Sequence, residues 1–396
     1  MANSYSVMKK NISFLFFSLI VNSFVFAQNK VPVFVSGKDG YASFRIPSII
    51  QLPNKKMIAF AEGRVNGAGD FGHVNIVMKT SIDGGKSWSV LQKIVSFGML
   101  QAGNAAPVVD LLDPQYPNGK IYLFYNTGNV NEGQLRQGKG IREVWYICSV
   151  DNGENWTAPM NITSQVHFPN GVIEERVYQN KEDWRTYANT PGHATQCIEG
   201  KYKGRIFIAA NHSVGGPKSN FKDYFSHGYY TDDHGKSFRL SNSLDLEGSN
   251  EATAAFISGD RLILNARNQQ GQIKTRITAF SNDGGEHFEK AFYENQLPDP
   301  ICEGAILNIG NRKGQTILAF VNASDTLYRN NLSIYISKDE GVHWTKRKII
   351  DSTMDTTKMK NDFTAYADIV KVGKRKIGVL YERDNYQQIV YSVIKW

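Results

Sequence analysis

Two polar residues stand where a chain rich in short apolar runs could use them for chemistry. Arg45 lies between apolar neighbours in Phe44-Arg45-Ile46-Pro47, directly before the apolar run 48–52, and Asp70 lies in a segment with glycines at positions 67, 69 and 72. A guanidinium can hold a carboxylate through two parallel hydrogen bonds, and a loop aspartate can donate or accept a proton. Taken alone, each has a simpler interpretation, a strand arginine that reaches solvent and a glycine-rich surface turn.

Other chemistries lack their sequence motifs. The eight histidines form no His-Glu-x-x-His or comparable metal-binding spacing, and no Walker loop is present. Gly-x-Ser-x-Gly is absent as well, so a serine-hydrolase elbow has no support. We expect a protein that needs neither a metal nor an organic cofactor.

The elements that must position these side chains are indicated by a repeat. The pattern Ser/Thr-x-Asp-x-Gly-x-x-Trp/Phe occurs five times, beginning at Ser81, Ser149, Thr231, Ser281 and Ser337. Each copy follows an apolar run, so we expect it at the turn between two antiparallel strands. Its Asp would accept turn amides, its Gly would take positive φ, and its aromatic ring would pack back over the hairpin. Calcium binding is the weaker alternative, because the alternating oxygen ligands of a calcium loop are missing.

The repeat spacing predicts the fold. The Asp positions of successive copies are 68, 82, 50 and 56 residues apart, and each interval allows a four-stranded sheet with one or two long loops. Five copies, with sequence left over at both ends, predict six such sheets. The last sheet would pair strands from the two termini, which removes exposed edges. We therefore expect an all-β, six-bladed β-propeller with its ligand over the central channel.

Residues 1–27 have the features of a secretion signal. A pair of lysines precedes the apolar run 14–21, and Ala27 ends a small-residue cleavage site. A membrane anchor is the competing interpretation, but the apolar run is short and polar residues interrupt it. We expect residues 28–396 to form one exported domain, periplasmic or extracellular, without an integral membrane segment.

Charge and cysteine content set further bounds. The formal charge is +8, and loss of the signal with its two lysines leaves +6. This mild excess suits an anionic substrate, although spread-out lysines are more often solvated surface. We expect no nucleic-acid partner. The three cysteines are too few for a disulfide framework. Cys148 lies in an apolar run and is interpreted as a buried residue, whereas the spacing leaves open whether Cys197 and Cys302 pair.

Together, the five Asp boxes and Phe44-Arg45-Ile46-Pro47 make this chain resemble the bacterial exo-α-sialidases (neuraminidases) over nearly its whole mature length. The resemblance implies three arginines that hold the carboxylate of sialic acid, namely Arg45, Arg267 and Arg329. It also implies that Arg64 lies near O4 or the N-acetyl side of the sugar and that Asp110 contacts O4. Glu382 corresponds to the acid that pairs with the first arginine and fixes its orientation.

The resemblance further implies an unusual nucleophile. A carboxylate nucleophile would approach a sugar that carries its own carboxylate, whereas a phenol avoids this repulsion, and sialidases with a tyrosine nucleophile are an exception among glycosidases. The family tyrosine corresponds to Tyr366, followed here by Ala367 where the family usually has Ser. Glu251 corresponds to the base that activates the phenol, and Asp70 to the acid and base at the leaving oxygen.

The predicted function is therefore a secreted exo-α-sialidase that hydrolyses terminal α-linked sialic acid from glycoproteins, glycolipids and oligosaccharides with retention. A trans-sialidase, including an intramolecular one, is the alternative among enzymes. A catalytically inactive propeller lectin is the alternative among binding proteins, although every catalytic position holds the competent residue. Linkage preference, the type of sialic acid and the oligomeric state stay open.

Overall fold

The computed structural model describes residues 1–2 and 30–396. The predicted signal peptide, residues 1–27, thus lies outside the described residues except for its first two. Among the helices of the described part, none has the length and apolar character needed to cross a membrane.

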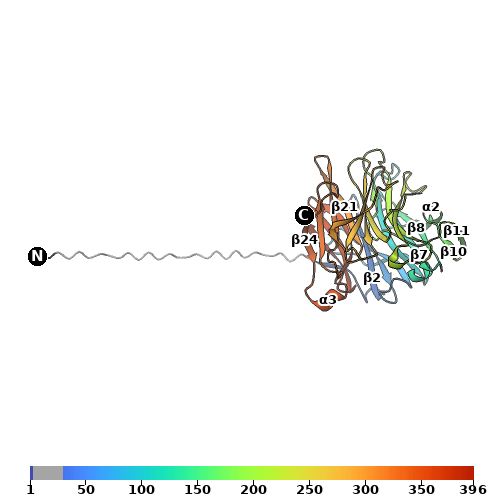
Figure 1. The fold of residues 1–396 in the computed structure, drawn as a ribbon, viewed down its shortest axis with the longest axis horizontal. Helices are drawn as coiled ribbons and strands as arrows, with labels where there is room; N and C mark the ends of the chain where they lie inside the picture. Colours follow the sequence, from blue (N-terminus) through green and yellow to red (C-terminus); the bar gives the residue numbers. More distant parts are fainter. Residues whose placement is uncertain (3–29) are drawn as a thin grey trace.

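The described chain is almost entirely β-structure, arranged in sheets whose strands pair antiparallel except at one contact between β4 and β6 (Figure 1). The largest sheet contains β2 (Ser43–Gln51), β3 (Met57–Arg64), β4 (Val74–Ser81), β5 (Gln92–Val95), β6 (Gln101–Asp110), β7 (Lys120–Gly128), β8 (Arg142–Ser149) and β9 (Met160–Asn161). The next contains β12 (Trp184–Asn189), β13 (Thr195–Gln196), β14 (Ile206–Val214), β15 (Tyr224–Thr231) and β16 (Arg239–Leu240). Two four-stranded sheets follow, β17 (Ser249–Phe256), β18 (Leu262–Asn268), β19 (Thr275–Ser281) and β20 (Phe292–Pro298), then β21 (Gly304–Arg312), β22 (Gln315–Ala323), β23 (Leu332–Ser337) and β24 (Thr345–Asp351).

The last sheet joins the two ends of the described chain. It places β1 (Val31–Val35) beside β27 (Gln388–Lys395), followed by β26 (Lys376–Arg383) and β25 (Thr364–Gly373). β1 and β27 pair antiparallel, with Val31 opposite Tyr391 and Val35 opposite Gln388. The prediction that strands from both termini complete one sheet is confirmed. The remaining elements are the hairpin β10 (Asn170–Ile173) and β11 (Arg176–Gln179) and the short helices α1 (Glu132–Arg136), α2 (Thr163–Val166), η1 (Ser219–Phe221) and α3 (Thr356–Lys360).

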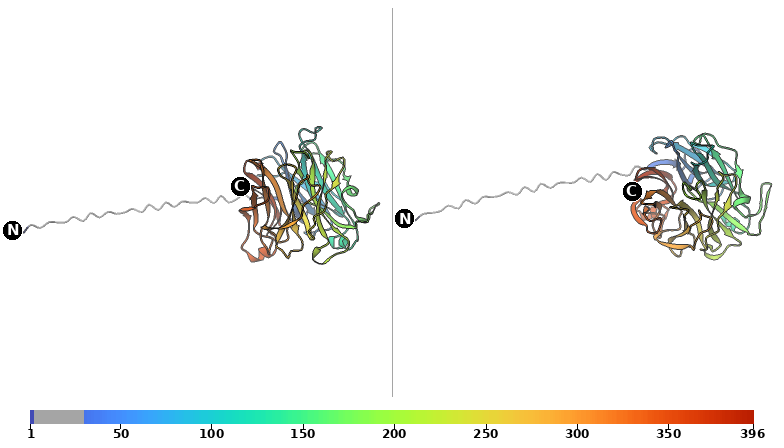
Figure 2. Two further views of the ribbon diagram at one scale, coloured as in Figure 1. Left: turned by 45° about the horizontal axis from the view of Figure 1, so that its top comes forward. Right: turned by 90° about the horizontal axis from the view of Figure 1, so that it is seen from above.

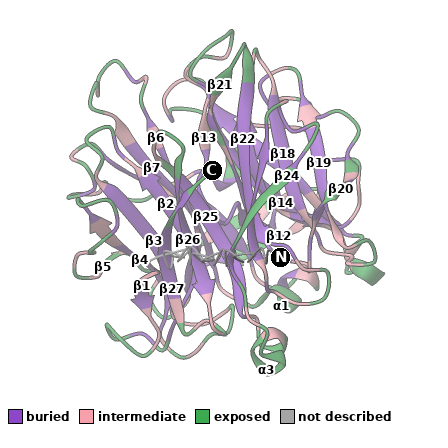
Figure 3. Ribbon diagram, turned by 90° about the vertical axis from the view of Figure 1, so that its left-hand side faces the viewer, coloured by how far each residue is buried: buried purple, intermediate pink, exposed green. Residues whose placement is uncertain are grey.

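Apolar side chains fill the spaces between sheets that follow one another in the sequence. Phe124 of β7, for example, packs edge-on against Tyr229 of β15. The cluster that contains Phe34, Phe44 and Tyr391 joins the last sheet to the first strands, which closes the ring. Seen from above, the sequence colours run around this ring until red lies beside blue (Figure 2). Burial is concentrated along the strands, whereas loops at both ends are exposed (Figure 3). The fold is an all-β, propeller-like arrangement.

The Asp boxes have the predicted turn geometry. In the second box, Asp151 Oδ1 accepts Ser149 Oγ at 2.8 Å and the Asn155 amide at 2.9 Å, while the Gly153 amide donates to Ser149 Oγ at 2.9 Å. The corresponding bonds recur in the other four boxes. Because these polar groups satisfy one another, the boxes act as structural staples and no calcium is needed to explain the aspartates.

The box glycines have a second role between sheets. All five have positive φ, between +80° and +95°. A Cβ built on Gly85 would lie 2.1 Å from the ring of Tyr391, and one on Gly153 would lie 2.7 Å from Ile58. Gly85 follows β4, whereas Tyr391 lies in β27 of the last sheet, and Gly153 follows β8, whereas Ile58 lies in β3. The obstructing side chain thus comes from an adjacent group of strands in the ring. Glycine is therefore required both for the backbone conformation and for close packing around the ring.

The three cysteines are free and buried. Cys148 is 5% exposed within an apolar cluster, as predicted. Cys197 donates to the carbonyl of Glu199 at 3.0 Å, and no disulfide joins it to Cys302.

Candidate active site

A polar cavity of about 410 Å³ opens at one end of the ring. It lies where β2, β6, β17 and β25 begin and where β3 and β18 end, because antiparallel strands bring these termini to the same side. The Asp boxes follow β4, β8, β15, β19 and β23 at the opposite end. Seven of the predicted site residues line the cavity, although they come from different sheets: Arg45, Arg64, Asp70, Glu251, Arg267, Arg329 and Tyr366.

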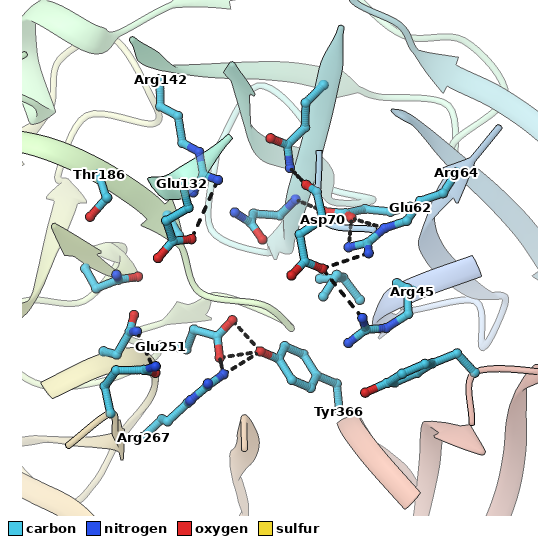
Figure 4. Close-up of a pocket in the computed structure, with 18 of the residues that line it drawn as sticks. Arg45, Glu62, Arg64, Asp70, Glu132, Arg142, Thr186, Glu251, Arg267 and Tyr366 are labelled. Atoms are coloured by element: carbon cyan, nitrogen blue, oxygen red, sulfur yellow. Dashed lines mark hydrogen bonds and ion pairs between the residues drawn. The ribbon is translucent and has the colours of Figure 1, made fainter. Parts of the chain in front are cut away.

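The centre of the cavity is a contact between a phenol and a carboxylate. Tyr366 Oη lies 2.7 Å and 2.6 Å from the two oxygens of Glu251. Arg267 Nη1 donates to both partners, to Glu251 Oε2 at 2.7 Å and to Tyr366 Oη at 2.7 Å. Figure 4 shows these three side chains converging. The arrangement gives the phenol a proton acceptor and gives the phenolate that would result a nearby cation.

Burial holds the resting phenol in its neutral form. Desolvation and the charge of Glu251 raise the pKa of Tyr366 well above its usual value, against the opposing charges of Arg267 and Arg329. A neutral phenol is a weak nucleophile, so it requires the adjacent base when it reacts. The geometry supplies that base at hydrogen-bonding distance.

Arg45 is fixed from behind by Glu382. Its Nε donates to Glu382 Oε1 at 2.7 Å and its Nη2 to Oε2 at 3.3 Å. Glu382 is fully buried and does not line the cavity, which agrees with the predicted supporting position. Burial lowers the pKa of Arg45, but the charge of Glu382, its hydrogen bond to the guanidinium and further contributions from Tyr386 and Asp70 together outweigh it and hold the pKa above its usual value.

The same carboxylate organises the backbone around it. Glu382 Oε1 also accepts the Ile46 amide at 2.9 Å, and Oε2 accepts the Tyr366 amide at 3.2 Å. Ile46 has φ +56°, a conformation that β-branched residues rarely adopt and that costs about 1–3 kcal/mol. Strain of this size persists because the surrounding bonds determine the backbone, and it is concentrated next to the arginine of the cavity.

Arg329 is the third of the arginines that were predicted to hold a carboxylate, and it lines the cavity with Arg45 and Arg267. It reaches the cavity from the loop after β22, where Nη1 contacts Tyr386 Oη at 3.1 Å and Nη2 donates to the Ile301 carbonyl at 3.1 Å. The guanidinium carbons of Arg45 and Arg329 each lie 5.5 Å from the centre of the Tyr366 ring. The phenol is therefore flanked by arginines, and the cavity around it is suited to an anion.

Asp70 lies across the cavity from Tyr366, with Arg64 and Arg45 on the same side of its carboxylate (Figure 4). Its Oδ1 is 2.8 Å from Arg64 Nη1 and 3.6 Å from Arg45 Nη1, and its side chain is 80% exposed. Arg64 also donates to the Ala68 carbonyl at 2.5 Å, and Gln101 donates to the Asp70 carbonyl at 2.9 Å. The glycine-rich segment is thus fastened at two points and presents its carboxylate to solvent.

The arginines set the protonation of Asp70. Desolvation raises the pKa of this carboxyl, but the charges of Arg64 and Arg45 and the hydrogen bond from Arg64 outweigh it and leave the pKa below its usual value. In the empty cavity Asp70 is therefore ionised near neutral pH. An anion bound by the arginines would offset part of their charge and raise the pKa of Asp70 again.

The prediction that Asp110 contacts the ligand is wrong. Asp110 is fully buried at the far end of β6 and does not line the cavity. It accepts Gln196 Nε2 at 2.6 Å and the amides of Leu112 and Asp113, and its other oxygen contacts His234 Nδ1 at 2.7 Å. The side-chain atoms of Asp110, Asp113 and His234 that could coordinate a metal ion lie within 4.8 Å of one another. Protein groups already satisfy the hydrogen-bonding capacity of the Asp110 carboxylate, so we interpret Asp110 as a structural residue.

Sequence reasoning missed several cavity residues. Arg142 donates to the Tyr187 carbonyl at 3.1 Å and lies 3.8 Å from Glu132, and both line the wall opposite Tyr366. Buried Glu62 accepts Arg64 Nη2 at 2.6 Å. Glu62 and Arg64 are two residues apart on a strand, so their side chains lie on the same face. Arg142 begins a strand, and Arg45 lies near the start of one. These patterns could have indicated cavity residues from the sequence. Glu132 begins the short helix α1 and Tyr386 lies in a turn, and neither position has a sequence pattern that points to the cavity.

Comparison with known proteins places this geometry in context. Residues 55–379 match the family model described as "BNR repeat-like domain". The chain is 24% identical over 364 residues to a sialidase of Micromonospora viridifaciens and 25% identical over 364 residues to a sialidase of Bacteroides fragilis. Both matches include 88% of this chain, but it spans only 51% and 61% of the lengths of these relatives. A solved structure described as "Hadza microbial sialidase Hz136" matches with a TM-score of 0.76 and 20% identity, covering 92% of this chain and 68% of that one.

Proposed function

Because this chain belongs to the family of BNR repeat-like domains, we propose that its cavity is the active site of a sialidase. The observation that carries the proposal is the Tyr366 phenol, which hydrogen-bonds to both oxygens of Glu251 in a cavity that five arginines line. Similarity to sialidases over 88% of the chain supports the same function. The substrates would be glycoproteins, glycolipids and oligosaccharides that end in α-linked sialic acid.

Substrate binding is assigned to Arg45, Arg267 and Arg329. A sialic acid carries its carboxylate on the anomeric carbon, so an anion must lie beside the reacting centre. One close charge pair contributes about 4 kcal/mol of Coulomb energy at an effective dielectric constant of 20, before desolvation. Three guanidiniums can therefore dominate ground-state binding, and their planar geometry orients the sugar. Arg64 would contact the sugar beside Asp70.

The first chemical step is assigned to Tyr366, Glu251 and Asp70. Tyr366 Oη attacks the anomeric carbon as its proton passes to Glu251, and Asp70 donates a proton to the departing glycosidic oxygen. The glycan leaves as an alcohol, and the sugar is bound to the tyrosine oxygen. Asp70 is ionised in the empty cavity, so the carboxylate of the substrate has to raise its pKa before this step.

The second step reverses these roles. Asp70 removes a proton from water, which attacks the anomeric carbon, while Tyr366 departs and recovers its proton from Glu251. Two displacements on opposite faces give net retention. Nothing in this scheme requires a metal or an organic cofactor.

We also propose that the propeller has six blades and that the protein is exported. The eight-stranded sheet consists of the units β2–β5 and β6–β9, which are linked by a single parallel pair, Val74 and Gln101. Treating these units as separate blades supports a six-bladed propeller. The sequence features of residues 1–27 support export to the periplasm or the extracellular space.

Product analysis with α2,3-, α2,6- and α2,8-linked sialosides tests the proposed activity. Mass spectrometry distinguishes free sialic acid from 2,7-anhydro or transferred products, so it separates hydrolysis from the trans-sialidase alternative. Tyr366→Phe is expected to lower kcat by about 10³-fold or more, while a sialic acid analogue still binds, because the arginines remain. Binding without turnover by the wild-type protein would instead identify a lectin.

A further inference from the structure

A second buried glutamate lies beneath the proposed nucleophile. Glu303 immediately precedes β21 and is only 2% exposed. Its Oε2 accepts the backbone amide of Ala367 at 2.9 Å, the residue that follows Tyr366. Its Oε1 is buried and has no hydrogen-bond partner among the described residues.

Glu303 and Glu382 support the same stretch of backbone in different ways. Glu382 accepts the amide of Tyr366 and Glu303 accepts the amide of Ala367, so two carboxyl groups hold consecutive peptide units. Glu382 is paired with Arg45 at 2.7 Å. Glu303, in contrast, forms no ion pair within the described part of the chain, so nothing of opposite charge directly compensates its burial.

The charges around Glu303 disfavour a further anion. Glu251 and Asp368 contribute negative charge, although Asp368 is paired with His193 at 2.6 Å. Arg276 is the opposing cation, but it is already bound to Asn265 at 2.8 Å, to Asp299 at 3.4 Å and to the Cys302 carbonyl. A carboxylate on Glu303 would therefore be buried beside like charges, with the opposing cation Arg276 engaged elsewhere.

We infer that Glu303 is a positioning residue that works as a neutral carboxylic acid, holding the strand that presents Tyr366 without adding a negative charge beneath the Glu251–Tyr366 pair. A carbonyl oxygen suffices to accept the Ala367 amide, so the support needs no charge. Burial, followed by the charges of Asp368 and Glu251, raises the pKa of Glu303 well above its usual value, which agrees with this form.

Neutrality of Glu303 also serves the proposed base. Glu251 must be ionised to accept the phenol proton, and a second carboxylate nearby would make Glu251 harder to ionise. The role in catalysis rests on the proposed function, because it assumes that Tyr366 reacts. The protonation state of Glu303 does not, and it can be measured without any substrate.

The sign of the stability effect follows from the raised pKa. The unfolded chain ionises Glu303 near pH 4.3, whereas the folded chain does so only at higher pH. The stability that neutral Glu303 contributes is complete below about pH 4 and is lost as pH rises through the folded pKa. A glutamine accepts the same amide but does not ionise in either state. Glu303→Gln should thus be more stable than the wild type at neutral pH, by a margin that grows with pH.

Glu340 provides the matched control. It is also a buried glutamate that accepts a backbone amide, that of Thr316 at 3.0 Å, but it pairs with Arg261 at 2.8 Å. Desolvation raises the pKa of Glu340, but the hydrogen bond from Ser258 and the charge of Arg261 contribute to an overall lowering of that pKa. Its stabilising effect is present above the unfolded pKa and is lost as pH falls through the folded pKa. Glu340→Gln should therefore be less stable than the wild type at neutral pH.

The experiment measures the melting temperatures of the wild type, E303Q and E340Q from about pH 4 to about pH 9. Infrared difference spectra of wild type and E303Q at neutral pH should contain the carbonyl band of a protonated carboxylic acid in the wild type. A gain in melting temperature for E303Q that increases with pH, together with this band, would support the inference. Three outcomes would overturn the inference that Glu303 is neutral. They are a lower melting temperature for E303Q that parallels that of E340Q, an E303Q chain that does not fold, and absence of the carboxylic acid band from the wild-type spectrum.

Kinetics test the positioning role separately. E303Q should keep a kcat close to that of the wild type, because the amide of Ala367 retains its acceptor. Glu303→Ala should lower kcat by roughly tenfold or more with a smaller change in KM, because the backbone below Tyr366 loses its support. Equal kcat values for Glu303→Ala and the wild type would remove the role in positioning. An inactive wild-type protein would contradict the proposed function and leave the melting and infrared results in force.

Discussion

Arg45 and Tyr366 are held by one carboxylate, so the residues proposed for binding and for chemistry share a support at the level of single residues. Glu382 contacts the guanidinium of Arg45 and the backbone amide of Tyr366. The sequence indicated the pairing of Glu382 with Arg45 only through the family resemblance, because the two lie 337 residues apart. The backbone contact had no sequence signal, since any residue type at position 366 would donate the same amide.

Replacing Arg45 with lysine tests the arginine cluster. A lysine keeps the charge but cannot form a planar, two-point contact with a carboxylate, so affinity for a sialic acid analogue should fall by about 10- to 100-fold. Calorimetric titration measures this. Arg205→Lys is the matched control, because Arg205 binds Asp232 through Nε and Nη2 at 2.7 and 2.8 Å and does not line the cavity. Unchanged affinity in a folded Arg45→Lys variant would exclude Arg45 from the binding site.

The pH dependence of the kinetics tests the link between Asp70 and the arginines. The free enzyme has a lowered pKa at Asp70, and bound substrate should raise it by offsetting Arg45. The acid must be protonated to act, so the rate falls as pH rises through this pKa. Since kcat/KM reports the free enzyme and kcat the complex, the basic limb of kcat should lie at higher pH. Coincident limbs, or the reverse order, would contradict this coupling.

At the scale of elements, the Asp boxes show how far local patterns reach. Their turn geometry was predictable because the hydroxyl and the carboxylate of each box find their hydrogen-bond partners within eight residues, as in the second box. The loop that carries α1 was not predictable. It presents Glu132 to the cavity, but its position depends on contacts with distant parts of the chain, such as the ion pair of Arg136 with Asp223, the residue before β15, at 2.7 Å.

Changes in a box should affect stability and leave catalysis intact. Asp151→Ala removes the acceptor of the Asn155 amide, and Trp156→Ala removes a ring that packs edge-on against Phe60 at 6.2 Å. Each should lower the free energy of unfolding by about 1–4 kcal/mol. Denaturant unfolding combined with steady-state kinetics checks this. A fully stable but inactive Asp151→Ala would show that the box belongs to the catalytic machinery.

At the scale of the whole molecule, the ring brings together residues that the sequence separates widely. Asp70, Glu251 and Tyr366 come from different parts of the chain and meet because each lies at the same end of its strands. The all-β class, the turns and the pairing of the terminal strands were predictable from repeats and alternation. Asp110 shows where prediction from the sequence failed. The sequence does not distinguish a buried structural acid from a ligand-binding acid unless it also shows which end of the strand faces the cavity, and Asp110 lies buried at the other end of β6.

The stereochemistry of the released sugar tests the central claim most directly, because it depends on Tyr366 and Asp70 acting from opposite sides of one cavity. Proton NMR during the first minutes of hydrolysis distinguishes the anomers of sialic acid before they interconvert. Two displacements, first by Tyr366 and then by water activated at Asp70, must release the α-anomer first. Initial release of the β-anomer would mean a single displacement by water and would contradict the covalent mechanism, even if sialidase activity were present.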